Sequence, residues 1–152
     1  MGAPENPTES DEASIQRGAE LYAINCQMCH GFDGTGGNQV MMDDGRFLDP
    51  APPLTKSTMT TEEMIDIVTC GKLTDTNIMP SFHEQAWTPE RPCWGKTEAD
   101  IPAEKRPPPW GVPLYPDEIE AVVGWVTCML VSAASCMKRS TRAELCSGPW
   151  PS

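Results

Sequence analysis

A run of five residues, Cys26-Gln27-Met28-Cys29-His30, constrains this chain more than any other feature. Two cysteines three positions apart, followed at once by a histidine, form the pattern of covalent c-type haem attachment. The spacing has a chemical reason: the two thiols reach the two vinyl groups on one edge of the porphyrin, and the next residue presents its imidazole to the iron. The motif therefore predicts one haem c, attached through Cys26 and Cys29, with His30 as an iron ligand.

Two other kinds of site share part of this motif. Half of a zinc site would need a second ligand pair at comparable spacing, but the remaining cysteines lie far apart and His83 is the only other histidine. A redox-active dithiol of the Cys-x-x-Cys kind is the other alternative. We favour haem attachment over both.

A second axial ligand is expected well downstream, on a loop that returns over the opposite face of the haem. Met79 meets this requirement because it lies 49 residues beyond His30, after a predicted helix and a glycine-containing turn. Pro80 stiffens the backbone that carries the sulfur and keeps the preceding residue extended. A thioether is a neutral, soft ligand that favours ferrous iron, so ligation by His30 and Met79 would raise the reduction potential.

Other residues compete with Met79 for this role. His83 is the main alternative ligand, since it lies only four residues from Met79. The chain has nine methionines, and most methionines in proteins are packing residues. Met64 and Met129 fit the apolar faces of predicted helices, so we expect them in the core. Met79 is the favoured sixth ligand.

Apolar residues recur at helical spacing in three segments, which are residues 10–26, 60–71 and 116–130. Ser10 is the expected N-cap of the first helix. Thr60 and Glu63 are spaced as a capping box at the start of the second, and Gly71 is placed to end it. Pro116 suits the first position of the third helix.

Residues 82–113 separate the second and third helices, and this segment contains seven prolines and three tryptophans. Proline removes a backbone donor and disfavours helix in the residue before it, so the segment is not expected to be helical. We predict an ordered, extended insertion anchored by buried tryptophan, with a flexible linker as the alternative. The predicted organisation is an acidic tail (1–9), one domain (10–131, with the insertion 82–113) and a C-terminal extension (132–152).

The chain resembles class I cytochromes c over roughly residues 14–81 and 114–131. The matching features, in order, are Gly18, Tyr22, the motif Cys26–His30, Gly31 with a glycine-rich loop, Pro52-Pro53-Leu54, Met79-Pro80 and Trp125. The resemblance implies an all-α cytochrome c fold with three main helices around one covalently bound haem. The long insertion, the C-terminal extension and the extra cysteines depart from the family pattern.

The resemblance also implies roles for particular residues. The first and last helices would cross at Gly18, Tyr22 and Trp125, where a glycine lets two backbones approach closely. A carbonyl in the Pro52-Pro53-Leu54 stretch would accept a hydrogen bond from the distal nitrogen of His30 and fix that ring. Pro52 is the preferred acceptor and Pro53 the alternative.

Five cysteines remain outside the motif, an odd number, so at most two disulfides form within the chain. We predict that Cys70 pairs with Cys93, and that Cys128 pairs with Cys136 or Cys146. This cysteine content suits an oxidising compartment such as the periplasm. The first thirteen residues lack the features of an export signal, so we expect the sequence to start near a mature N-terminus.

The formal net charge is −11, and residues 1–81 alone contribute −9. Acidity therefore lies with the predicted haem region, which disfavours nucleic acid and anionic lipid as partners and favours redox proteins with a basic docking face. The longest apolar stretch covers residues 121–134 and is too short to span a bilayer, so no transmembrane segment is expected.

These features favour a one-electron carrier between redox proteins, which is not itself an enzyme. The alternative is a fixed haem-bearing subunit of a larger oxidoreductase or respiratory complex, in which the insertion and the extension would form interfaces. A haem enzyme or gas sensor is a third hypothesis, and it requires an open iron position that Met79-Pro80 argues against.

Overall fold

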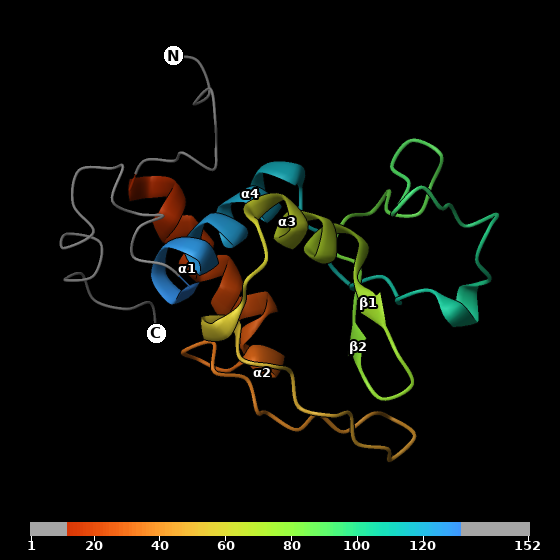
Figure 1. Cartoon of the computed structure of the whole chain (residues 1–152), viewed down its shortest axis with the longest axis horizontal. Coiled ribbons are helices and arrows are strands. Elements are labelled where there is room, and N and C mark those ends of the chain that lie inside the picture. Colours follow the sequence, from red (N-terminus) through yellow and green to blue (C-terminus); the bar gives the residue numbers. More distant parts are fainter. Residues whose placement is uncertain (1–11, 132–152) are drawn as a thin grey trace.

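The structure is a computed structural model that describes residues 12–131. The predicted acidic tail (1–9), the N-cap at Ser10 and the C-terminal extension (132–152) lie outside the described residues. The elements are α1 (Glu12–Asn25), α2 (Gln27–His30), the 3₁₀ turn η2 (Leu54–Lys56), α3 (Thr61–Cys70), β1 (Lys72–Leu73), β2 (Ile78–Met79), η3 (Ala103–Lys105), α4 (Pro116–Trp125) and the π-helical turn η4 (Val126–Val131). Figure 1 shows α1, α3 and α4 packed together, with the irregular segments around them.

Helices α1 and α4 cross at the residues that the family resemblance implied. A Cβ atom at Gly18 would overlap the carbonyl oxygen of Ala121 and lie 2.8 Å from the Cβ of Trp125, so only glycine permits this approach. One turn further along α1, the rings of Tyr22 and Trp125 are 4.7 Å apart between centroids. The buried core spreads from this crossing and includes Ile15, Ala19, Met64, Ile119, Val122 and Val123.

Helix α3 begins and ends as predicted. Thr60 forms the capping box: its hydroxyl accepts a hydrogen bond from the Glu63 backbone, and the Glu63 carboxylate accepts one from the Thr60 N–H. Gly71 caps the other end at φ 74°, a conformation that favours glycine, and donates its N–H to Ile67. Met64 is buried, as expected for a core residue.

The last helix is shorter than the predicted segment 116–130. Pro116 opens it as expected, and the Glu118 carboxylate accepts a hydrogen bond from the Tyr115 N–H. After Trp125 the chain continues as the π-helical turn η4. The Thr127 hydroxyl bonds back to the carbonyls of Val123 and Gly124, a contact that competes with the regular ladder and accompanies the change in winding.

A two-stranded antiparallel sheet modifies the predicted all-α fold. Strands β1 and β2 pair Lys72 with Met79 and Leu73 with Ile78. The turn between them is closed by a hydrogen bond from the Thr74 N–H to the Asn77 carbonyl. The main helices are as predicted, but the loop that carries Met79 is a short β-hairpin.

The insertion (82–113) folds as a series of turns with the single helical turn η3. It is ordered as predicted, but it is not mainly extended. The predicted disulfide Cys70–Cys93 is present and ties the insertion to the end of α3. Trp87 is buried beside it, whereas Trp94 is 58% exposed, so only part of the expected tryptophan anchoring is seen. Cys128 is also disulfide-bonded, and its predicted partners, Cys136 and Cys146, lie outside the described residues.

Candidate functional site

The Cys-x-x-Cys-His motif continues the helical path of α1. The Cys26 N–H bonds to the Tyr22 carbonyl at 2.9 Å, and the His30 N–H bonds to the Cys26 carbonyl at 2.9 Å. Because α1 is fixed against α4 at Gly18, this continuity places the motif at a defined distance from the helix crossing. The two cysteines and the histidine therefore lie on one short helix, α2, and its N-cap.

The two thiols of the motif are free and half-buried. Burial, with a smaller contribution from neighbouring Cys29, raises the pKa of Cys26 to about 12, and burial also raises the pKa of Cys29. No group of three His, Cys, Asp or Glu side chains within residues 12–131 is placed to hold a metal ion.

His30 has a buried ring nitrogen without a partner. Its Nδ1 makes no hydrogen bond, and burial lowers the pKa of the ring, which favours the neutral imidazole. A neutral imidazole is the form that binds a metal. The backbone after His30 is fixed, because the Tyr22 hydroxyl donates to the Gly31 carbonyl at 2.6 Å and the Gly36 N–H donates to the His30 carbonyl at 2.8 Å.

The Pro52-Pro53-Leu54 stretch lies against the glycine-rich loop that follows His30. The Leu54 N–H donates to the Gly34 carbonyl at 2.7 Å, which joins the two segments. The carbonyls on either side of Pro52 are engaged, since Ala51 accepts from Gly37 and Pro53 accepts from Lys56. The predicted hydrogen bond from His30 Nδ1 to Pro52 or Pro53 is not formed in this structure.

Met79 lies at the end of β2 and is half-buried. Its side chain packs against the same core cluster as Cys26 and Leu54, so the motif, the proline stretch and the hairpin all border one core. In Figure 1, α2 and the β1–β2 hairpin lie on the same side of the three main helices, the lower side in this view. The segments that carry the predicted ligands thus border the same core cluster.

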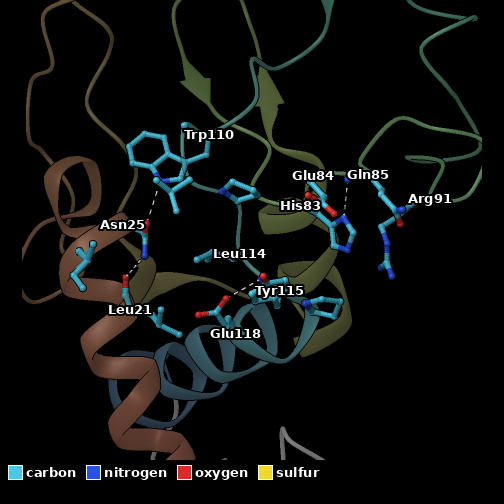
Figure 2. Close-up of a pocket in the computed structure, with 15 residues that line it drawn as sticks. Leu21, Asn25, His83, Glu84, Gln85, Arg91, Trp110, Leu114, Tyr115 and Glu118 are labelled. Carbon is cyan, nitrogen blue, oxygen red and sulfur yellow. Dashed lines mark hydrogen bonds between the residues drawn. The ribbon is translucent and has the colours of Figure 1, made fainter.

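His83, the alternative ligand, lines a different site. Figure 2 shows it beside Arg91 in a pocket of about 1080 Å³ between α1, the start of α4 and the insertion. The lining of this pocket includes Asn25 and Trp110 but none of Cys26, His30 and Met79. The Nδ1 of His83 already accepts a hydrogen bond from the Gln85 N–H at 3.0 Å. Its surroundings do not favour a role as an iron ligand.

Three large apolar side chains beside the motif are exposed to solvent. Ile24 is 77% exposed, and Met28 and Phe32, which follow it at four-residue intervals, are also exposed. Met28 and Phe32 line a pocket of about 650 Å³ that includes the Asn38 side chain. The Asn38 amide donates to the carbonyls of Gln27 and Met28, so it fixes the exposed side of α2.

Two polar contacts of this region were not predicted. The Tyr22 hydroxyl reaches the Gly31 carbonyl, and burial raises the pKa of this phenol, so it stays a donor. The Trp110 indole N–H donates to the Asn25 side chain at 3.0 Å, which joins the insertion to the residue before Cys26. The only sequence signal for the first contact is the nine-residue spacing of Tyr22 and Gly31, and the second depends on tertiary folding.

A protein-family model described as cytochrome c oxidase, cbb3-type, subunit III matches residues 13–91. The chain belongs to this family. The match covers α1, α2, α3 and the β1–β2 hairpin and ends within the insertion. Neither the curated proteins nor the solved structures gave a significant match to the chain.

Membership of the cbb3-type subunit III family identifies a class I c-type cytochrome domain, which implies haem c binding and electron transfer. The residues present fit such a group. The motif offers two unpaired thiols, and His30 offers a neutral imidazole whose buried Nδ1 lacks a partner. No helix within residues 12–131 is long and apolar enough to cross a membrane.

Proposed function

We propose that this chain is a monohaem c-type cytochrome that carries single electrons between redox proteins. One haem c would be attached covalently through Cys26 and Cys29, with His30 and Met79 as the axial ligands. The observation that carries the proposal is the Cys26–His30 motif on α2, together with the buried, unpartnered Nδ1 of His30. Bound haem would supply a one-electron iron couple.

His30 and Pro52 would act as a pair. His30 would bind the iron through Nε2, and its Nδ1 would donate to the Pro52 carbonyl, which would set the orientation of the ring. The loop bond between Leu54 and Gly34 brings that carbonyl to the segment that follows His30. Such an acceptor would also offset the cost of burying Nδ1, which has no hydrogen-bond partner in the structure.

Met79 would close the remaining coordination position. Its place on a paired strand limits its movement, and its half-buried side chain contacts the core that Cys26 also borders. A closed position leaves no site for peroxide or a gas, which suits a carrier and excludes an enzyme or sensor role. The neutral thioether stabilises the reduced state and raises the potential.

Partner contact would use the exposed apolar residues beside the motif. Ile24, Met28 and Phe32 lie within a few residues of Cys26 and Cys29, and exposed apolar groups of this kind mark interaction sites. The acidic charge of the haem region favours a partner with a basic docking face. The Cys70–Cys93 disulfide supports an oxidising location such as the periplasm.

The family description favours a second function, a fixed electron-transfer subunit of a larger oxidase or other respiratory complex. In that case the insertion and the C-terminal extension would bind neighbouring subunits. Gel filtration of the native protein from its own cells separates the two functions. A carrier elutes at the mass of one chain, whereas a subunit elutes with its complex.

Carbon monoxide binding tests the ligand assignment. The unmodified ferrous protein should bind carbon monoxide slowly, and Met79→Ala should bind it fast while keeping its haem. His83→Ala should behave like the unmodified protein. Rapid binding by the unmodified protein would contradict the closed site and favour an enzyme or sensor. A bis-imidazole spectrum that disappears in His83→Ala would assign the sixth ligand to His83.

A further inference from the structure

The C-terminal end of α3 has all of its last carbonyls satisfied. A helix normally leaves its final four carbonyls without partners inside the helix, or caps them locally. Here Gly71 takes the first of the four, and the start of the insertion takes the other three. The donor–acceptor pairs are Phe82 N–H to Val68 (3.1 Å), His83 N–H to Thr69 (3.4 Å) and Trp87 Nε1–H to Cys70 (3.0 Å).

The same end of α3 is also linked covalently to the insertion. Cys70 forms the disulfide with Cys93, and both are buried, Cys93 to 1% exposure. With Trp87 they form a small core of their own, separate from the main one. Trp87 is thus held on two sides, by packing on the disulfide and by its hydrogen bond to the Cys70 carbonyl.

The backbone at Met79 lies close to Gly71, at the end of α3. A Cβ atom at Gly71 would lie 2.5 Å from the Met79 carbonyl oxygen and 2.7 Å from both the Pro80 carbonyl carbon and the Pro107 Cβ. Three segments therefore meet at Gly71: the end of α3, the residues around Met79 and the returning part of the insertion. No side chain at residue 71 could fit between them.

The chain just after Met79 is bonded to the returning part of the insertion as well. The Ser81 N–H donates to the Pro108 carbonyl at 2.9 Å, and the Trp110 N–H donates to the Ser81 carbonyl at 2.8 Å. The insertion consequently begins and ends beside Ser81. These contacts hold the chain two residues after Met79 against the insertion.

We propose that the insertion is a clamp on the Met79 hairpin, in which Trp87 and the Cys70–Cys93 disulfide are positioning residues for the sixth ligand. The inference rests on the proposed ligation by Met79. With that ligation, an external ligand would reach the iron only after the sulfur leaves, which requires local opening of the hairpin. Contacts that tie the insertion to α3 hold the end of the hairpin through Ser81, and they would therefore slow ligand entry without touching the iron.

Cyanide binding to the ferric, haem-loaded protein tests the clamp. Trp87→Phe keeps an aromatic ring but removes the N–H that donates to Cys70, and it should speed cyanide binding about fivefold, the effect of one hydrogen bond. Cys70→Ala combined with Cys93→Ala should speed it about a hundredfold. Glu104→Gln changes an exposed residue of the same insertion and should leave the rate unchanged.

Two further variants separate the clamp from a general loss of stability and from a wrong ligand assignment. Thr60→Ala weakens the opposite end of α3 by removing its capping box, so it reports general loss of stability. The clamp predicts no change in its cyanide rate, and an acceleration equal to that of Trp87→Phe would overturn the inference.

Met79→Ala sets the upper limit of the cyanide-binding rate. If Met79→Ala has no effect, the proposed ligation is wrong. If Met79→Ala is fast but both clamp variants match the unmodified protein, the ligation stands and the clamp is wrong.

Discussion

The α1–α4 crossing and the insertion are ordered in different ways. At the crossing, one continuous apolar core holds two helices together, and close packing at Gly18 sets their distance. The insertion shares a second core of Cys70, Trp87 and Cys93 with the end of α3, adds Phe82 to the main core, and leaves Trp94 exposed. Proline removes backbone donors, so this proline-rich segment forms short turns and no long helix or strand. Besides its own turn hydrogen bonds, a covalent link and the donors that it gives to the last carbonyls of α3 order it.

The two regions also lie next to different predicted iron ligands. The α1–α4 crossing fixes the motif, since Tyr22 contacts Trp125 and donates to the carbonyl after His30. The insertion is hydrogen-bonded to Ser81, two residues after Met79. One region thus positions one predicted iron ligand, and the other region the second. Variants in each region should affect different properties of the protein.

Removal of the insertion's disulfide should have the largest effect on stability. Cys70→Ala combined with Cys93→Ala frees a link between residues 23 positions apart and should lower the free energy of unfolding by about 3 kcal/mol. Denaturant unfolding of the haem-loaded protein measures this loss. Hydrogen exchange should show the increased opening in residues 82–113 and at the end of α3. An unchanged denaturation midpoint would mean that packing alone orders the insertion.

A methyl group at the helix crossing should have a smaller effect. Gly18→Ala places a Cβ against the Ala121 carbonyl, so α1 and α4 must move apart, at a cost of about 2 kcal/mol. Gly124→Ala is a matched control on α4, where a Cβ would meet no atom within 4 Å. The control should gain about 0.5 kcal/mol, because alanine favours helix over glycine. Equal stability of the two variants would show that the crossing is not tightly packed.

Titration of His83 should give the smallest effect. Burial, and then the positive charge of Arg91, lower the pKa of His83, while Glu84 opposes them. The unfolded chain therefore binds a proton near pH 6.5 that the folded chain resists, so stability is complete above that pH and falls below it. His83→Gln should reduce the loss of unfolding free energy between pH 7 and about pH 5. A slope identical to that of the unmodified protein would contradict this assignment.

Local sequence signals predicted much of the structure. The capping box of Thr60 and Glu63, the end of α3 at Gly71 and the start of α4 at Pro116 each depend on residues within a few positions of one another. The Cys26–His30 motif is equally local. The helix crossing at Gly18 was predicted through the family resemblance, since close approach of two distant helices has no signal in either helix alone.

Other features depend on contacts that the sequence does not display. Strands β1 and β2 have two residues each, too few to show alternation, so the hairpin was expected as a loop. The bond from Trp87 to the Cys70 carbonyl exists only after the insertion folds back on α3. The π-helical winding after Trp125 accompanies a threonine contact within a segment whose apolar pattern is helical.

Haem retention after denaturation tests the central claim most directly. The protein as isolated should be unfolded in acid and extracted with organic solvent, and the mass of the remaining polypeptide measured. Thioether bonds at Cys26 and Cys29 survive unfolding, so we predict a chain heavier by one haem, and no covalent haem in Cys26→Ala combined with Cys29→Ala. If the solvent removes the haem from the unmodified chain, or the chain carries none, covalent haem attachment is contradicted.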